Sequence, residues 1–183
     1  MKKVFLFLLS AIMLTSCGEE VKRKSVGAPF ELLVVCDDAI WNTPAGQTLD
    51  QALRTAIPGL PQKEVSFKYT RVGYDDFNTS NNALRNIILV DINSGHKKCE
   101  FRFDRNIYAS PQTVLAINAP DKDSFGKFVG KNSQFIVDFF TEKERETQIA
   151  SLEEKYNKTA MSLIKKKFGC EMKIPTSISG YKQ

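Results

Sequence analysis

The chain has 183 residues, with 26 lysines and arginines against 21 aspartates and glutamates, for a formal net charge of +5. Its 42% hydrophobic residues, 13 phenylalanines among them, exclude an intrinsically disordered protein and suffice for one packed domain. The pI of about 9.0 does not by itself indicate nucleic-acid binding. Acidic residues are interspersed throughout and no basic stripe or binding motif is present, so we expect no nucleic-acid partner.

The chain opens with features of a secretory signal. Lys2 and Lys3 precede an apolar run at 4–14, which is too short to span a bilayer but has the length of a signal-peptide core. The next residues, Leu-Thr-Ser-Cys ending at Cys17, resemble the lipobox of bacterial lipoproteins, in which the cysteine is acylated and the chain is cut before it. The resemblance implies a signal peptide at 1–16 and acyl chains, palmitate among them, on Cys17, which would anchor the protein stably in a membrane.

Residues 17–29 are polar and charged and contain two glycines and a proline, which is typical of a tether. Gly18 is not the aspartate that often retains lipoproteins at the inner membrane, so we expect the outer membrane of the cell envelope. Glu19 and Glu20 weakly resemble acidic surface-export tags. They leave the choice between the periplasmic and the surface face undecided.

The first half of the remaining chain predicts mostly strands. One helix is expected after Thr43, with Pro44 at its first position and apolar residues at helical spacing up to Ala56. Apolar runs or alternating patterns bounded by turn residues indicate the strands. These are expected at 30–36, at 65–72, at 86–92, and in a hairpin that pairs Phe101 and Phe103 with 114–119.

The second half predicts helices. Asp121 can cap a helix whose apolar residues recur at intervals of three and four up to Phe140. Thr141 and Glu144 have the spacing of a capping box, which predicts a break there. A last helix is expected to end at the lysines 165–167, with Gly169 just after it. A further strand is expected at 170–174.

This order of elements predicts an α+β fold. We expect a mixed, largely antiparallel sheet with helices on one face, a relative of the ferredoxin-like fold. An α/β doubly wound sheet is the alternative. The globular domain is expected at 30–175, and we interpret the tail at 176–183 as the start of a second half.

The cysteines and the single histidine predict no metal site and no cofactor. Cys36 lies in an apolar run and is expected to be buried. Cys99 and Cys170 could pair in an oxidising compartment, but three free thiols are the default expectation, because disulfide geometry is strict. His96 lies in a polar loop, and a lone loop histidine usually has no catalytic role.

Two places could bind a ligand. Asp37 and Asp38 follow a buried strand, where ligands collect in α/β sheets, and with Trp41 and Asn42 they could bind a cation, a sugar or an amine. Arg85 precedes another strand and could hold a carboxylate or phosphate. The same residues also suit loop, cap and surface ion-pair roles, which are commoner.

Several short stretches, taken together and in this order behind a lipobox, carry a family resemblance. They are 34–41 (VVCDDAIW), 58–62 (PGLPQ), 84–87 (LRNI), 108–112 (YASPQ), and 167–169 (KFG) leading to 174–175 (IP). They resemble an uncharacterised lipoprotein family of Bacteroidota, the domain of unknown function 4837. The resemblance implies no activity. It implies a truncated member, because the family continues beyond the Ile-Pro element.

Two functions remain open. The first is a membrane-anchored envelope lipoprotein that acts as a non-catalytic binding or interaction module, held by acyl chains on Cys17 and binding an unknown envelope protein or small ligand. It is favoured because no nucleophile and base occur in a recognisable constellation. The alternative is a metal-assisted, hydrolase-like enzyme that uses Asp37 and Asp38.

Overall fold

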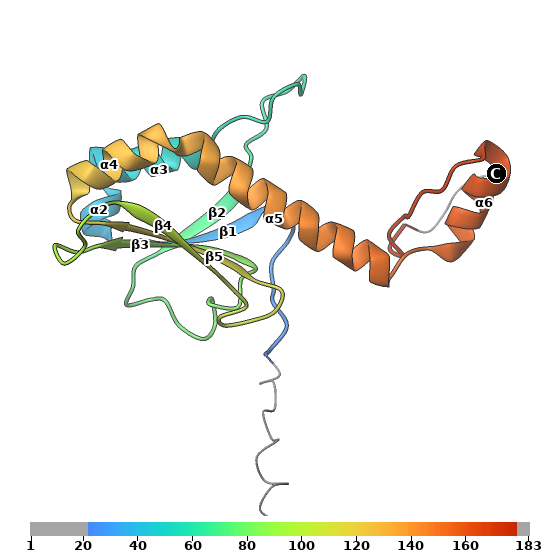
Figure 1. The fold of residues 1–183 in the computed structure, drawn as a ribbon, viewed down its shortest axis with the longest axis horizontal. Coiled ribbons are helices and arrows are strands. Elements are labelled where there is room, and N and C mark those ends of the chain that lie inside the picture. Colours follow the sequence, from blue (N-terminus) through green and yellow to red (C-terminus); the bar gives the residue numbers. More distant parts are fainter. Residues whose placement is uncertain (1–21, 179–183) are drawn as a thin grey trace, which may run out of the picture.

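The computed structural model describes residues 22–178, which form a sheet with helices on one side of it. The signal peptide and Cys17 therefore lie outside the described residues. The strands are β1 (Glu31–Val35), β2 (Lys68–Val72), β3 (Asn86–Ile92), β4 (Glu100–Arg105) and β5 (Thr113–Ala119). They form one five-stranded sheet in the order β2–β1–β3–β5–β4 (Figure 1).

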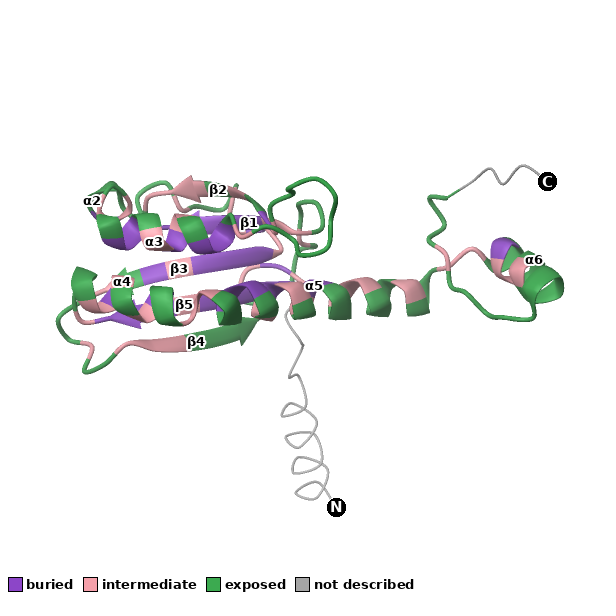
Figure 2. Ribbon diagram, turned by 90° about the horizontal axis from the view of Figure 1, so that it is seen from above, coloured by how far each residue is buried: buried purple, intermediate pink, exposed green. Residues whose placement is uncertain are grey.

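The helices are α2 (Asp38–Trp41), α3 (Pro44–Leu53), α4 (Lys122–Lys131), α5 (Ser133–Glu154) and α6 (Lys158–Phe168). From α2 to the first half of α5 they lie on one face of the sheet (Figures 1 and 2). The second half of α5 extends past the sheet, and α6 stands beyond its end. Within residues 22–178, no helix combines the length and the apolar character needed to cross a bilayer.

The predicted α+β class with helices on one face is confirmed, but the expected strand direction is wrong. β1 pairs in parallel with β2 and β3, and β3 pairs in parallel with β5. Only the predicted β4–β5 hairpin is antiparallel. The sheet is therefore mostly parallel and is not ferredoxin-like. The order of its parallel strands resembles the doubly wound alternative, but among the described elements loops take the place of helices on the second face.

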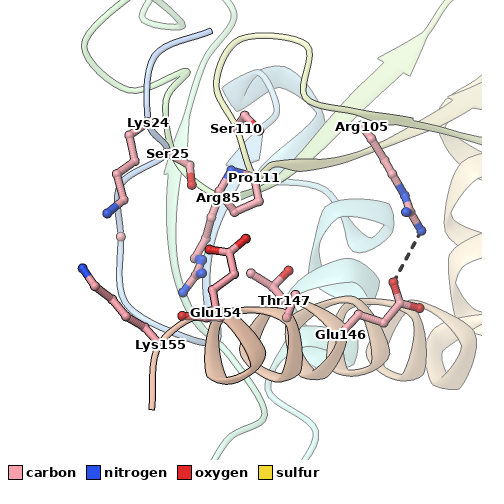
Figure 3. Close-up of a pocket in the computed structure, with 13 residues that line it drawn as sticks. Lys24, Ser25, Arg85, Arg105, Ser110, Pro111, Glu146, Thr147, Glu154 and Lys155 are labelled. Carbon is pink, nitrogen blue, oxygen red and sulfur yellow. Dashed lines mark hydrogen bonds and ion pairs between the residues drawn. The ribbon is translucent and has the colours of Figure 1, made fainter. Parts of the chain in front are cut away.

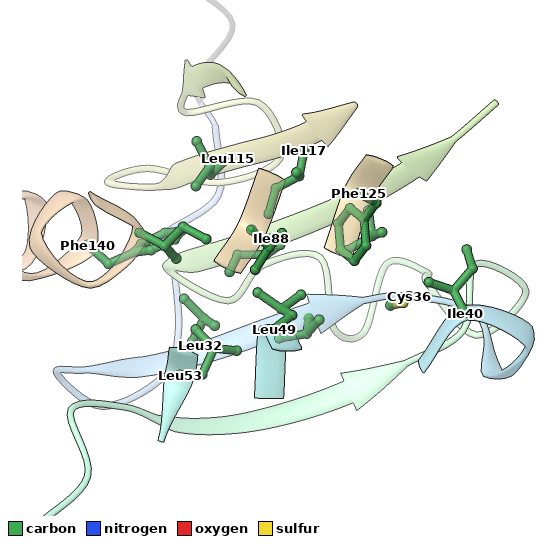
Figure 4. Close-up of a cluster of buried hydrophobic side chains, with 14 of the residues drawn as sticks. Leu32, Cys36, Ile40, Leu49, Leu53, Ile88, Leu115, Ile117, Phe125 and Phe140 are labelled. Carbon is green, nitrogen blue, oxygen red and sulfur yellow. The ribbon is translucent and has the colours of Figure 1, made fainter. Parts of the chain in front are cut away.

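The main core lies between the sheet and its helices (Figure 4). Leu32 and Ile88 of the sheet, Leu49 of α3 and Phe125 of α4 are all at most 1% exposed. The close contact of the two helices depends on a glycine, because a Cβ on Gly126 would lie 3.1 Å from Ala45. Asp121 caps α4 as predicted and accepts a hydrogen bond from the Ser124 N–H.

The break predicted at Thr141 and Glu144 is wrong, since α5 runs without interruption from Ser133 to Glu154. Ile136, Phe140 and Glu144, one turn apart, are all buried on its sheet-facing side. The chain breaks earlier, at Asn132, which ends α4. Packing of this continuous face therefore prevails over the local capping pattern.

The second face carries a smaller core that loops cover. Leu33, Val35, Ile87 and Val114 are buried there under side chains of the loops at 73–85 and 106–112. Gln112 joins the two loops, because its amide nitrogen donates to the carbonyls of Asn82 and Leu84, each at 2.7 Å.

Part of the predicted tether belongs to the folded domain. We call residues 23–26 the N-terminal strip. Ser25 N–H donates to Ser110 O at 3.0 Å on one side, and Val26 N–H donates to Ala83 O at 2.9 Å on the other. Backbone hydrogen bonds thus hold the strip between the two loops, and the expectation of a free tether up to residue 29 is wrong for this stretch.

The C-terminal end is only partly as predicted. Gly169 ends α6 in the left-handed conformation, with φ of 69°, as expected. The strand predicted at 170–174 is absent, and no strand of the described chain lies beside this segment. The residue just after this segment, Pro175, makes an isolated bridge with Tyr156.

Phe140→Ala tests the main core. Phe140 is fully buried and packs edge-on against Phe67, with ring centroids 6.1 Å apart. The truncation should lower the free energy of unfolding by about 3–5 kcal/mol in urea titrations. Phe168, which lies on α6 and is 71% exposed, is the matched control. Phe168→Ala should change the free energy of unfolding by no more than about 0.5 kcal/mol. Equal losses for the two variants would contradict this core.

Candidate functional site

The predicted acidic site lies at the carboxyl edge of the sheet. Because β1 and β2 are parallel and end side by side, Asp37 and Asp38 meet the loop after Val72. A hollow of about 430 Å³ lies there, and its lining includes the carboxylates Asp37, Asp38, Asp75 and Asp76 together with Arg71. The strand ends thus bring polar groups together, as expected for parallel strands.

The two aspartates that follow β1 already have partners within the protein. Asp37 accepts a hydrogen bond from the Tyr74 N–H at 3.0 Å, and Asp38 forms a 2.6 Å ion pair with Arg71. Arg71 also donates to the Cys36 carbonyl at 2.8 Å and lies over the Trp41 ring. Trp41 packs against the main core and Asn42 ends α2, so neither lines the hollow. These contacts agree with the structural role that the sequence also allowed.

No group of three or more His, Cys, Asp or Glu side chains within 22–178 is arranged to hold a metal ion. The hydrolase-like alternative therefore still depends on Asp37 and Asp38 alone. Burial raises the pKa of the Cys36 thiol to about 12, although Arg71 nearby opposes the shift, so Cys36 stays a neutral thiol at physiological pH. Cys36, Cys99 and Cys170 are all free.

His96 lies on the loop-covered face of the sheet. Its Nε2 is 2.8 Å from the Asp91 carboxylate, which is half exposed. The hollow beside it, about 520 Å³, is also lined by Tyr74, Arg102 and Asp104. The Tyr74 hydroxyl donates to the Val90 carbonyl, and burial raises its pKa. Because no serine, threonine or cysteine among residues 22–178 lines the hollow, the histidine and aspartate have no nucleophile from the described chain to activate there.

The larger candidate is a pocket at the opposite, amino edge of the sheet, with a volume of about 770 Å³ (Figure 3). We call it the amino-edge pocket. The N-terminal strip, the start of β3, the end of β4, the loop before β5 and the second half of α5 each contribute to its wall. Segments that are distant in sequence therefore meet there.

Cations and hydroxyl groups dominate the wall of the amino-edge pocket. Arg105 is paired with Glu146 at 3.4 Å, whereas Lys24 and Lys155 form no ion pair within 22–178. Figure 3 shows these two lysines on the same side of the pocket. The cations are Lys24, Arg85, Arg105 and Lys155, the hydroxyls belong to Ser25, Ser110, Thr147 and Ser151, and the carboxylates are Glu146 and Glu154. This lining suits a ligand with an anionic group.

A buried carboxylate supports the wall. Glu144 is 1% exposed, and its Oε1 lies 3.1 Å from Arg85 Nη1 without hydrogen-bond geometry. Its Oε2 accepts a 3.0 Å hydrogen bond from the Asn86 amide, which also donates to Glu31 O. Arg85, predicted as a ligand-binding residue, thus neutralises a buried charge while it lines the pocket. The sequence contained a signal for Glu144: it falls on the apolar stripe one turn after Phe140.

Residues 25–153 match the family of a domain of unknown function, DUF8532. The chain belongs to this family. No curated protein and no solved structure matches it. The match begins in the N-terminal strip and ends within α5, so the family domain includes most of both candidate sites and excludes α6. It is a different family from domain 4837, and the resemblance to that family remains an expectation.

The buried charge makes a stability prediction. Arg85→Met removes the only cation paired with Glu144 within the described chain, and should lower the free energy of unfolding by about 3–5 kcal/mol. Adding Glu144→Gln removes the buried charge and should recover most of that loss. Urea unfolding of the two variants is the measurement, and a double variant no more stable than Arg85→Met would contradict the assignment.

Proposed function

We propose that the chain is a lipoprotein of the cell envelope, anchored in the outer membrane by acyl chains on Cys17, which binds a ligand with an anionic group in the amino-edge pocket. It acts without catalysis. The observation that carries the proposal is the docking of the N-terminal strip into the wall of that pocket, because it links the predicted anchor to the binding site.

The spacing in the chain supports this link. Lys22 is the fifth residue after Cys17 in the sequence, so five residue steps join the two. At full extension they span roughly 18 Å, at about 3.6 Å per residue. An anchor at Cys17 would therefore keep the strip, and the pocket beside it, near the membrane surface.

The chemistry of the pocket supports binding over catalysis. Its lining offers cations and hydroxyl groups, which bind phosphates and carboxylates. The chain's single histidine lies elsewhere, on the loop-covered face of the sheet. The ligand would be a small anionic molecule of the envelope or an acidic segment of an envelope protein, which crosslinking in native envelopes can distinguish.

The anchor is testable through Cys17. Cys17→Ala should abolish labelling by a palmitate analogue and leave the precursor uncleaved, because the lipoprotein peptidase needs the acylated cysteine. Cys170→Ala is the matched control, since Cys170 is an exposed free thiol, and should keep the label. Membrane fractionation and gel fluorescence are the measurements. Label that survives Cys17→Ala would overturn the anchor.

The pocket is testable separately with inorganic phosphate as the probe. At a concentration about tenfold above the dissociation constant, phosphate should raise the melting temperature by roughly 3–6 °C. Lys24→Glu combined with Lys155→Glu should abolish the shift, since both lysines line the pocket. Lys97→Glu, an exposed lysine at the opposite edge of the sheet, should preserve it. A shift that the double variant retains would exclude this pocket.

A further inference from the structure

The strand β4 has a free edge beside an exposed aromatic cluster. β4 is the last strand of the sheet order, and among residues 22–178 it pairs with β5 alone. Phe101 stacks near Phe135, with ring centroids 4.9 Å apart, and Phe103 meets Phe139 at 6.0 Å. Phe103 is nonetheless 60% exposed and Phe135 46% exposed. Unpaired strand edges and contiguous apolar surface are both features of interaction sites.

The hydrogen-bond pattern shows which backbone groups of β4 face outward. Asn106 N–H donates to Gln112 O, in line with the register that pairs Asp104 with Val114. In an antiparallel ladder, hydrogen-bonded and non-bonded pairs alternate. The even-numbered residues of β4 therefore bond to β5, and the backbone groups of Phe101, Phe103 and Arg105 face away from the sheet.

We propose that β4 pairs with β4 of a second copy of this chain, antiparallel about a two-fold axis at Phe103. This register places each outward-facing residue opposite another, Phe101 opposite the partner's Arg105 and Phe103 opposite the partner's Phe103. It forms about six backbone hydrogen bonds, two for each hydrogen-bonded pair. The two sheets become one, and the aromatic clusters of both copies meet on the helix side.

The charges of β4 select this register. Arg102 and Asp104 form no ion pair within residues 22–178, although ion pairs are frequent elsewhere on the surface. With the axis at Phe103, each Arg102 faces an Asp104 across the interface. With the axis at Arg102, the two arginines face each other and Glu100 faces Asp104. Opposite charges across strands stabilise pairing and like charges oppose it.

Disulfide crosslinking of the full chain in membranes tests the proposal. All variants carry Cys170→Ser, which removes an exposed free thiol. Phe103→Cys should form a covalent dimer under mild oxidation, because opposed Cα atoms in a hydrogen-bonded pair lie about 5.5 Å apart. Ile149→Cys is the matched control, since Ile149 is also 60% exposed but lies on α5. A dimer yield from Phe103→Cys no greater than the control's would overturn the pairing.

Charge reversal tests the register. In the Phe103→Cys background, Asp104→Arg should reduce the dimer yield at least several-fold. Arg102 of each copy would then face the arginine introduced at position 104 of the other copy, which places two like-charged pairs across the interface. Adding Arg102→Asp restores opposite charges and should restore the yield. A yield that Asp104→Arg leaves unchanged, or that the second change fails to restore, would overturn the proposed register.

Discussion

The buried carboxylate of Glu144 links the helical layer to the amino edge of the sheet. Through Arg85 and Asn86 it connects α5 to the start of β3, and the Asn86 amide continues the connection to Glu31 at the start of β1. A charge withdrawn from water needs such partners, and they constrain where α5 can lie. The helix therefore crosses the sheet edge at one position, and its second half forms a wall of the amino-edge pocket.

The charged side chains at the two edges of the sheet differ in whether they have partners within the described chain. At the carboxyl edge, Arg71 and the Tyr74 N–H occupy the carboxylates that follow β1. At the amino edge, Lys24 and Lys155 find no carboxylate partner within the described chain. Ligands usually collect at the carboxyl ends of parallel strands. Here the larger and more cationic site lies at the other end, beside the segment that leads to Cys17.

The sequence predicted the elements better than their arrangement. Each strand and the helices from α3 to α6 carry an apolar pattern, so β3 was found with both of its ends. The direction of pairing was missed because the connection between β2 and β3 is a loop, at 73–85, that shows no crossover helix. Arg85 and Asp37 were both found as polar residues next to strands. Tertiary packing places these two residues at opposite edges of the sheet, and it pairs Arg85 with Glu144. Short-range sequence patterns do not encode such packing.

The N-terminal strip has a mechanical consequence. Any pull on the chain from its N-terminal side reaches the backbone hydrogen bonds of Ser25 and Val26 before it reaches β1. Those bonds lead to the two loops that cover the second face, which Gln112 ties together. A force applied to the N-terminal side is therefore distributed over the loops at 73–85 and 106–112. The parallel strands do not bear it first. The proposed anchor at Cys17 would therefore load the loops of the second face before it loads the strands of the sheet.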